Sequence, residues 1–458
     1  METMQAVKQN HSPTRELATF VARTTFRDIP ENVREQAKLC ILDWLGSALA
    51  GSLQPPAKII RDLVKENGGR KESTVLGSRT KNSCVNAALA NGIIGHIVEF
   101  DDLHVESIIH PAAPVIPASL AVAESNGSNG QDLITSIVLG YDVEIRIGLA
   151  MNLSHYRYWH STGTCGTFGA AAAAGKILNL DEGRMRHALG IAGTEASGLI
   201  EVFGTMSKPL NAGKAAQNGV IAALLAKKGF TSTNKILESD KGYCQASSQS
   251  PNLNLITLDL GKRFEILNDS FKNHASCAHA HSALDAALNL AKGHEIKPHT
   301  IDRIVVETYP IAVEIVGRNY TPKTSSEGKF SLPYCMAVAM IYGKVGLTEF
   351  SSKKLKDPKV LELSRKVTVE AGREFDSAKL WWAKVTICKT DGTELSCNIE
   401  MPKGHPNNPL TNTELAKKFR DLASLTLPTR RVNKIIETVT KLESLKNVKS
   451  LTTLLRTQ

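Results

Sequence analysis

Six ionisable side chains lie close together within a dozen residues, 99–110, of the stretch from Gly95 to Pro117. They are four carboxylates and two imidazoles: Glu99, Asp101, Asp102, His104, Glu106 and His110. Like charges this close repel each other and are costly to desolvate, so they contribute little to an ordinary hydrophobic core. Two interpretations stay open, namely a solvated acidic loop between two helices and a site in which these groups move protons.

A histidine and a lysine elsewhere in the chain each stand at an expected helix start. His160 precedes an Ala- and Gly-rich segment, and a helix N-terminus can hold an anion. Lys208 follows two hydroxyl residues and precedes a proline, which suits carboxylate binding or proton transfer. The plainer alternatives are a capping or core histidine and a lysine on a solvated turn.

Residues 271–281 combine one lysine, one cysteine and three histidines: Lys272, His274, Cys277, His279 and His281. A metal held by His279 and His281, or by His274, is one interpretation. The HExxH arrangement of many catalytic zinc sites is absent, so we expect no metal here. Further along, Tyr320 lies before another expected helix start and is either structural or part of a site.

The sequence lacks the motifs of several large enzyme classes. It contains no GxSxG nucleophile elbow, no GxGxxG fingerprint and no Walker loop, which argues against α/β-hydrolases, Rossmann dehydrogenases and P-loop enzymes. Acid–base chemistry on a small anion remains, with basic groups binding carboxylates. The net charge of +10 fits an anionic partner, while dispersed lysines and only 5% aromatic residues make nucleic acid the weaker choice.

The composition is that of a globular protein, with 458 residues, 42% of them hydrophobic and 22% charged. We find no apolar run suited to spanning a bilayer and no signal-peptide core in residues 1–20, so we expect a soluble, cytoplasmic protein without a membrane partner. The eight cysteines form no CxxC pair and are expected to be reduced, mostly buried thiols.

The elements that must position these residues change in character along the chain. Helical periodicity and small-residue runs predict helices through roughly the first 260 residues, the first opening with a Ser12 cap. A strand over 301–310 and a hairpin over 382–402 follow, with helices at 330–343 and 357–367 between them. We predict a mainly α protein with a helical domain (1–262), an α+β domain (263–404) and a C-terminal helical segment (405–458) that returns to the first domain.

Four segments resemble the MmgE/PrpD family in order and spacing, over nearly the whole chain. They read GHIVEFDDLHVESIIHPAAPVIPASLAVAE, WHSTGTCGTFGAAAAAGKILNL, GTMSKPLNAGKAAQNGV and KFSLPYCMA. That family includes 2-methylcitrate dehydratase, cis-aconitate decarboxylase and iminodisuccinate epimerase. The resemblance implies a large all-helical domain, a smaller α+β lid domain, a homodimer, and no metal or other cofactor.

Residue by residue, the resemblance implies a catalytic set and a substrate-binding set. The catalytic set is His110, His160, Lys208 and Tyr320. The family has an acidic residue where this chain has Glu99, a lid lysine at the position of Lys272 and, in some members, a histidine where this chain has Cys277. Two neighbouring histidines, His104 and His281, complete the substrate-binding set. The residues expected to bind a small anionic polycarboxylate are therefore Glu99, His104, Lys272, Cys277 and His281.

The resemblance does not single out the reaction. The ExDDxH pattern that begins at Glu99 resembles fungal cis-aconitate decarboxylases, whereas FGTMSKP resembles the epimerase branch. We expect a metal-independent lyase that decarboxylates cis-aconitate to itaconate by acid–base catalysis. The alternatives are a 2-methylcitrate dehydratase-type hydro-lyase, an iminodisuccinate epimerase-type isomerase and a non-catalytic polycarboxylate-binding protein.

Overall fold

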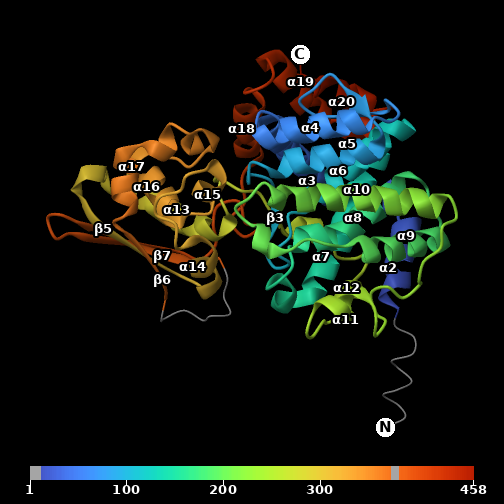
Figure 1. The fold of residues 1–458 in the computed structure, drawn as a ribbon, viewed down its shortest axis with the longest axis horizontal. Helices are drawn as coiled ribbons and strands as arrows, with labels where there is room; N and C mark the ends of the chain where they lie inside the picture. The colour runs from blue at the N-terminus through green and yellow to red at the C-terminus, as the bar shows by residue number, and fades with distance from the viewer. Residues whose placement is uncertain (1–11, 373–380, 458) are drawn as a thin grey trace, which may run out of the picture. The chain divides into compact units, whose positions relative to one another are not determined.

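The computed structural model describes residues 12–372 and 381–457 (Figure 1). The start of the chain, on which part of the signal-peptide expectation rests, lies outside these described residues. The described chain forms two compact units. The first comprises the chain up to Ile97, Asp101–Asp269 and the chain from Asn412 onwards, and the second comprises Val98–Phe100 and Ser270–Thr411. The fold is mainly α with a smaller α+β part, as predicted.

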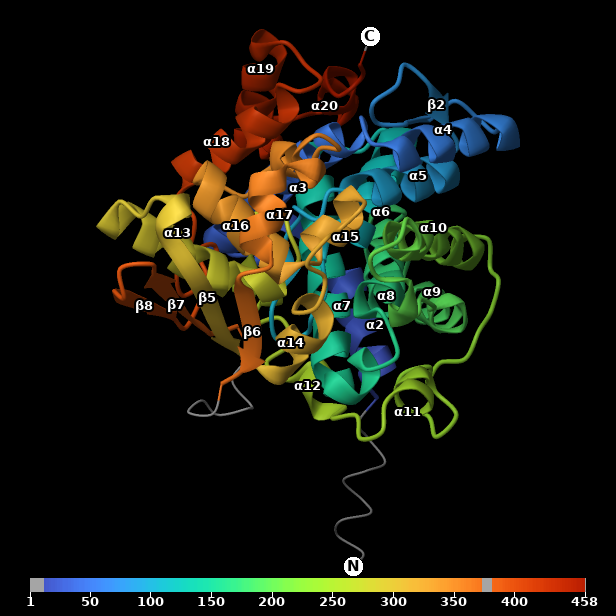
Figure 2. The same cartoon turned by 60° about the vertical axis from the view of Figure 1, so that its left-hand side comes forward.

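The first unit is built from helices. In chain order its longer helices are α2 (Pro13–Arg23), α3 (Glu31–Gly51), α4 (Pro55–Asn67), α5 (Cys84–His96), α6 (Ala112–Asn126), α7 (Gly130–Tyr156), α8 (Ser161–Ile177), α9 (Glu182–Glu195) and α10 (Ser207–Lys227). The short helices α11 (Tyr243–Ser247) and α12 (Asn254–Thr257) follow. The C-terminal helices α18 (Asn412–Ala423), α19 (Thr429–Thr440) and α20 (Lys449–Leu454) complete the unit, and α18 packs along α3 (Figure 2).

Small residues let the central helices of this unit approach closely. A Cβ atom added to Gly92 of α5 would lie 2.8 Å from the Cα atom of Gly213 in α10. Helices α5, α6 and α8 are buried around most of their circumference, so they form the middle of the helical layer. The small-residue runs in the sequence therefore serve helix packing, as predicted for residues 82–98.

One predicted cap is wrong in its detail. Helix α2 begins at Pro13, as expected, but the Ser12 side chain makes no capping hydrogen bond. Its hydroxyl donates instead to the carboxylate of Glu238, at 2.6 Å. Ser12 thus ties the first helix to a distant loop of the same unit.

The second unit contains a four-stranded sheet in the order β6-β5-β7-β8. Strand β5 (Ile301–Thr308) pairs parallel with β6 (Val367–Ala371) and antiparallel with β7 (Ala383–Lys389), which pairs antiparallel with β8 (Glu394–Ile399). The hairpin between β7 and β8 is confirmed, and Gly392 in its turn has a φ of +85°. Strand β6 was not predicted, since the helix expected over 357–367 ends at Ser364.

Helices accompany this sheet in the second unit. Helix α13 (His281–His294) packs on β7 and β8, and α16 (Leu332–Tyr342) packs on α13 and on α17 (Pro358–Ser364). Two short helices, α14 (Pro310–Val316) and α15 (Ser325–Lys329), lie between β5 and α16 in the chain. This is the α+β arrangement that the sequence predicted for the later part of the chain.

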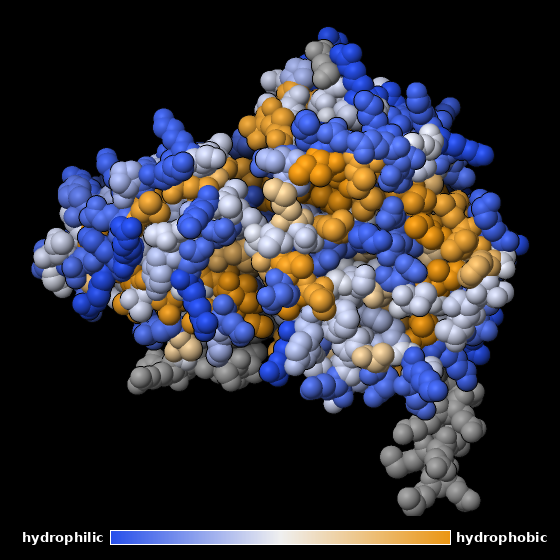
Figure 3. Space-filling view, in the orientation of Figure 1, coloured by the Kyte–Doolittle hydropathy of each residue, from blue (hydrophilic) through white to orange (hydrophobic). Residues whose placement is uncertain are grey.

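Surface and cysteine chemistry agree with a globular protein. All eight cysteines are unpaired and only Cys397 is not buried, as predicted. Among the described residues, no helix combines the length and the apolar character that a bilayer crossing requires. Polar side chains cover much of the face in Figure 3, and apolar side chains gather on the first unit over α4 and α10.

The close contact of α5 and α10 yields a stability prediction. In the variant Gly213→Ala, the new methyl group would meet Ile93 Cγ1 at 2.5 Å and the Leu89 carbonyl oxygen at 2.6 Å. We expect the free energy of unfolding in urea to fall by about 1–3 kcal/mol because the helices must move apart. The control Gly183→Ala, whose nearest atom is Asp181 Oδ1 at 3.4 Å, should be neutral or slightly stabilising. Equal losses in both variants would contradict this account.

Candidate active site

The ionisable stretch between Gly95 and Pro117 is buried. Asp101 and Asp102 are completely inaccessible to solvent and His104 is 1% exposed, whereas Glu106 is exposed. The solvated acidic loop is therefore the wrong interpretation of this cluster. Charged groups are kept in such a place only when they are paired or share protons.

Three histidines of the first unit come together. His96 is the last residue of α5, His110 lies just before α6, and His160 directly precedes α8. The ring centroids of His96 and His110 are 4.8 Å apart, and those of His96 and His160 are 5.8 Å apart, with the latter pair stacked. The structure thus brings together His110 and His160, which the sequence proposed separately, and adds His96 between them.

A backbone carbonyl fixes the protonation of the His110 ring. The Nδ1 atom of His110 lies 2.6 Å from the carbonyl oxygen of Asp102, which can only accept a hydrogen bond, so Nδ1 carries a proton. The amide N–H of His110 donates to the hydroxyl of Thr162 at 3.0 Å, which anchors the loop to α8. In the neutral ring, Nε2 therefore presents a lone pair and has the character of a base.

His160 has the opposite tautomer. The side-chain nitrogen of Asn211 lies 3.3 Å from His160 Nδ1 and also donates to the Leu199 carbonyl at 3.4 Å, which identifies it as the amide nitrogen. Nδ1 of a neutral His160 consequently accepts, and Nε2 carries the proton. Neutral His160 is therefore a proton donor through its Nε2 atom, whereas neutral His110 is a proton acceptor through its own Nε2 atom.

Lys208 lies beside this cluster. It is 3% exposed, so the solvated-turn interpretation is wrong for this lysine. Its Nζ atom lies 5.2 Å from the ring centroid of Phe203, and that ring meets the His160 ring edge-on at 5.0 Å. Lys208 is thus a buried cation separated from His160 by the ring of Phe203. Such a cation is suited to holding a carboxylate during proton transfer.

A second network of buried acids supports the loop. The Tyr141 hydroxyl donates to Asp102 Oδ2 at 2.6 Å, and the Ala112 N–H donates to Asp102 Oδ1 at 3.1 Å. Burial raises the pKa of Asp102 to about 7, against the effect of hydrogen bonds from Asp269 and Tyr141. Burial and the charge of Asp102 raise the pKa of Asp269 well above its usual range, so the two carboxyls share a proton near neutral pH.

In the second unit, two buried lysines hold the short segment Val98–Phe100. Lys272 Nζ lies 3.5 Å from Glu99 Oε2 and donates to the Glu99 carbonyl at 3.2 Å. Lys329 Nζ donates to the Val98 carbonyl at 2.8 Å. Glu99 itself has a φ of +54°, a backbone conformation that costs energy for a residue with a side chain. The structure therefore pairs Glu99 with Lys272, two residues expected to bind substrate.

The remaining expected site residues have diverse surroundings. His104 Nδ1 lies 2.9 Å from the Ser107 hydroxyl, and Cys277 is buried with its N–H donating to the Lys329 carbonyl at 2.9 Å. His281 begins α13, and its Nε2 lies 3.3 Å from the Ser276 carbonyl. Tyr320 is 36% exposed, and its backbone carbonyl accepts a hydrogen bond from Ser364 at 3.0 Å. The roles of these residues in binding or catalysis stay predictions.

Two protein-family models match this chain over most of its length. Residues 15–256 match the MmgE/PrpD N-terminal domain, and residues 274–444 match the MmgE/PrpD C-terminal domain. The chain belongs to the MmgE/PrpD family. With its relatives, this makes it an enzyme of the lyase class, as predicted.

Relatives of this MmgE/PrpD chain are similar from end to end. The cis-aconitate decarboxylase-like protein oryM of Aspergillus oryzae is 30% identical, over 96% of this chain and 97% of its own. The cis-aconitate decarboxylase of Aspergillus terreus is 28% identical, over 96% of this chain and 95% of its own. The cis-aconitate decarboxylase of Homo sapiens is 28% identical, over 97% of this chain and 95% of its own.

The described residues offer two close groups of potential metal ligands, and both are already hydrogen-bonded. One group consists of His96, Asp101 and His110. A metal there would have to break the hydrogen bond between His96 and Asp101, so we treat this group as a proton-handling cluster. The other contains Cys40, whose thiol has its pKa raised well above the usual value by burial. The alternative ligands that the sequence suggested for a metal, His274, His279 and His281, belong to neither group.

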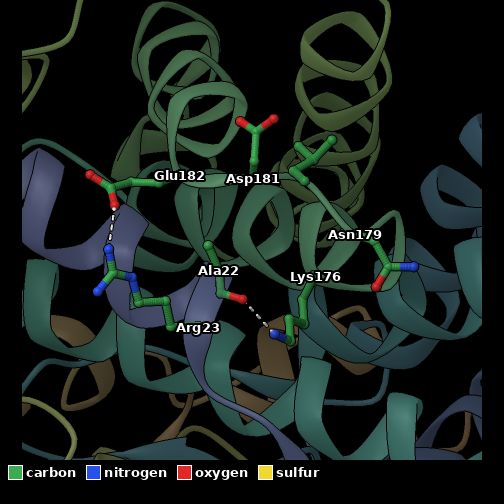
Figure 4. Close-up of a pocket in the computed structure, with 7 residues that line it drawn as sticks. Ala22, Arg23, Lys176, Asn179, Asp181 and Glu182 are labelled. Atoms are coloured by element: carbon green, nitrogen blue, oxygen red, sulfur yellow. Dashed lines mark hydrogen bonds and ion pairs between the residues drawn. The ribbon is translucent and has the colours of Figure 1, made fainter.

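A surface pocket of about 410 Å³ lies elsewhere on the first unit of this MmgE/PrpD protein (Figure 4). Lys176 donates to the Ala22 carbonyl there, and Arg23 pairs with Glu182. His160 and Lys176 stand at opposite ends of α8, and sixteen residues at 1.5 Å per residue separate them by about 24 Å. Because it lies far from the histidines, we assign this pocket no part in the chemistry.

Two residues of the histidine cluster were missed in the sequence. His96 ends a helix of small apolar residues, and a lone histidine in such a run more often belongs to the core. Asn211 lies one turn beyond Lys208 in α10 and carries no motif of its own. The position of His96, fourteen residues before His110 and three before the first carboxylate of the stretch, Glu99, is the signal that could have indicated it.

The shared proton of Asp102 and Asp269 leads to a pH prediction. Because their pKa values are raised on folding, the folded state holds a proton that the unfolded state has lost, and stability falls as the pH rises from about 5 to 7. One such proton lowers the free energy of unfolding by about 1.4 kcal/mol per pH unit. Asp269→Asn should flatten this dependence in urea denaturation.

The matched control for this prediction is Asp62→Asn. Asp62 is exposed on α4 and pairs with Lys58, so its replacement should leave the slope as it is. A wild-type stability that rises between pH 5 and 7, or an unchanged slope in Asp269→Asn, would show that the two carboxyls do not share a proton.

Proposed function

We propose that this MmgE/PrpD protein decarboxylates cis-aconitate to itaconate. The observation that carries the proposal is the first unit's cluster of His110, His160 and Lys208, which joins a proton acceptor, a proton donor and a buried cation. The names of the fungal and human relatives support the choice of substrate. Metal-independent acid–base catalysis is part of the same proposal.

The reaction needs a cation and a proton donor. When the carboxymethyl group loses carbon dioxide, the electrons of the broken C–C bond form a new C=C bond. The electrons of the old double bond then move to the carbon beside another carboxylate, which becomes enediolate-like. A lysine next to that carboxylate would stabilise the developing charge, and we assign this role to Lys208. A donor must then protonate the carbon.

We assign the proton donor to His160 and a second acid–base role to His110. The assignment is supported by the Nε2 proton that Asn211 leaves on His160. In the second unit, we propose that Tyr320 takes part in catalysis and that Glu99, Lys272, Cys277 and His281 bind the substrate, together with His104 of the first unit. Lys272 already has a carboxylate partner in Glu99, so a substrate carboxylate would join an existing ion pair.

One observation favours a second reaction. A base at His110 and an acid at His160 form the pair that dehydration requires, with one group removing a proton beside a carboxylate and the other protonating the leaving hydroxyl. A 2-methylcitrate dehydratase-type activity is therefore the alternative. An epimerase needs the same two groups on opposite faces of its substrate.

The test is proton NMR of the purified, chelator-treated protein with cis-aconitate, 2-methylcitrate and iminodisuccinate in separate samples. We expect itaconate to form from cis-aconitate alone. His160→Gln should lower kcat by about 10²–10⁴-fold because the proton donor is lost. The control His299→Gln changes an exposed histidine and should keep full activity. Water loss from 2-methylcitrate would identify the alternative, and full activity of His160→Gln would refute the assignment.

We also propose that the protein is a homodimer. Large apolar side chains of α4 and α10 are exposed, among them Ile59, Leu63 and Leu210. Apolar side chains also gather over these two helices on the face in Figure 3. Exposed apolar side chains gathered in this way are typical of protein interfaces.

Light scattering after gel filtration should give twice the chain mass of 49.6 kDa. Leu63→Asp places a charge in the proposed interface and should shift the mass toward the monomer. Leu425→Asp changes an equally accessible leucine of the C-terminal segment and should leave the mass unchanged. A monomeric wild-type protein would refute the proposal.

A further inference from the structure

Asn211 lies against the His160 ring and is held there by two glycines. A Cβ atom added to Gly163 of α8 would lie 3.0 Å from the Cβ atom of Asn211. A Cβ atom added to Gly198 would lie 3.0 Å from the Cγ atom of Asn211, and the φ of Gly198, +143°, disfavours a residue with a side chain there. Two glycines from different segments thus leave room for the Asn211 side chain and confine it.

The backbone next to His160 fixes the acceptor that orients this amide. The His160 N–H donates to the Gly198 carbonyl at 3.0 Å, and the Ile200 N–H donates to the Tyr158 carbonyl at 3.1 Å. These two hydrogen bonds form an antiparallel bridge, which fixes the Leu199 carbonyl relative to the His160 backbone.

The Asn211 amide then has one orientation that satisfies both of its neighbours. Its nitrogen lies 3.4 Å from the Leu199 carbonyl oxygen and 3.3 Å from His160 Nδ1. A carbonyl oxygen can only accept, whereas the amide nitrogen carries two N–H groups and can only donate. One N–H therefore goes to each acceptor, so Nδ1 of a neutral His160 presents its lone pair and Nε2 carries the proton.

We propose that Asn211 is a positioning residue that makes His160 the proton donor by fixing its tautomer. The inference rests on the proposed function, because it assumes that His160 gives a proton to the substrate. That proton passes from Nε2 to the carbon, and the ring recovers one from water before the next turnover. His110 has the opposite tautomer, since the Asp102 carbonyl keeps its proton on Nδ1. An amide donor thus makes one ring an acid, and a carbonyl acceptor makes the other ring a base.

Several titratable groups surround the histidine cluster and stay the same when residue 211 is changed. They are Lys208 of α10, His96 with Asp101, His110 with the Asp102 and Asp269 carboxyls, and His155 of α7. Burial lowers the pKa of His155 to about 4, so its ring is neutral in the tests below. A tautomer of His160 that differs between two variants at position 211 therefore reports on the side chain at that position.

Two substitutions separate the tautomer from the mere presence of a side chain. Asn211→Asp keeps the shape but can only accept, so His160 should carry its proton on Nδ1 and lose the donor at Nε2. We expect kcat for itaconate formation to fall about 10²–10⁴-fold, with little change in KM. Asn211→Ala leaves both tautomers populated, so kcat should fall only about 2–10-fold. The control Asn234→Asp changes an exposed asparagine and should keep full activity.

The experiment uses the full-length protein at pH 8.5, about two units above the usual histidine pKa. In protein with nitrogen-15 in the histidine rings, NMR shows which ring nitrogen carries a proton, because the two kinds of nitrogen resonate far apart. His160→Gln identifies the His160 signals among the thirteen histidines of the chain. Itaconate formation from cis-aconitate is measured on the same samples. The NMR readout needs no substrate, so it tests the role of Asn211 even if no itaconate forms.

A proton on Nε2 of His160 in the wild type and on Nδ1 in Asn211→Asp, with the loss of kcat, supports the inference. A proton on Nδ1 in the wild type overturns it. A folded Asn211→Asp variant also overturns it if His160 keeps the wild-type tautomer, if its ring is doubly protonated, or if kcat stays unchanged.

Asn211→Ala decides the matter if Asn211→Asp does not fold. A fraction of His160 rings with the proton on Nδ1 then supports the inference, and the absence of such a fraction overturns it. Absence of itaconate together with the expected tautomers would refute the proposed substrate and leave the role of Asn211 intact.

Discussion

The hydrogen bonds of Asp102 connect the loop before α6 to the helices around it. Its carbonyl holds the His110 ring, its carboxylate binds the N–H of Ala112 at the start of α6, and the Tyr141 hydroxyl of α7 binds the same carboxylate. One residue thus fixes the tautomer of a histidine and the start of a helix. Because all of these groups are buried, each hydrogen bond forms where water cannot replace it.

The buried polar groups lie among closely packed helices. Glycines and alanines in α5, α8 and α10 let the helix backbones approach closely. Several polar groups of the cluster then bond to one another through short hydrogen bonds, as His96 does with Asp101 and Tyr141 with Asp102. Tight packing and unusual protonation are therefore two results of the same small-residue pattern.

Much of this could be predicted from the sequence, and the reason differs for each part. Amphipathic helices such as α2, α4 and α18 have clear periodicity, and the hairpin at Asp391-Gly392 has a strong turn signal. Strand β6 was missed because it is short and directly follows a helix. Domain boundaries were expected near 263 and 404, and the compact units divide after Asp269 and after Thr411.

The site was harder to predict than the fold. Motifs indicated His110, His160 and Lys208 because each stands at a helix start among small residues. His96 and Asn211 have no local signature, and they meet His160 from 64 and 51 positions away in the chain. The pairing of Glu99 with Lys272 spans 173 positions, which no local pattern encodes.

The division of the chain also affects its synthesis. The polypeptide leaves the first unit after Ile97 for three residues, returns, leaves again after Asp269 and comes back at Asn412. A ribosome therefore finishes the whole second unit before it makes α18, which packs along α3. Until then the nascent first unit exposes the surface of α3 that α18 will cover.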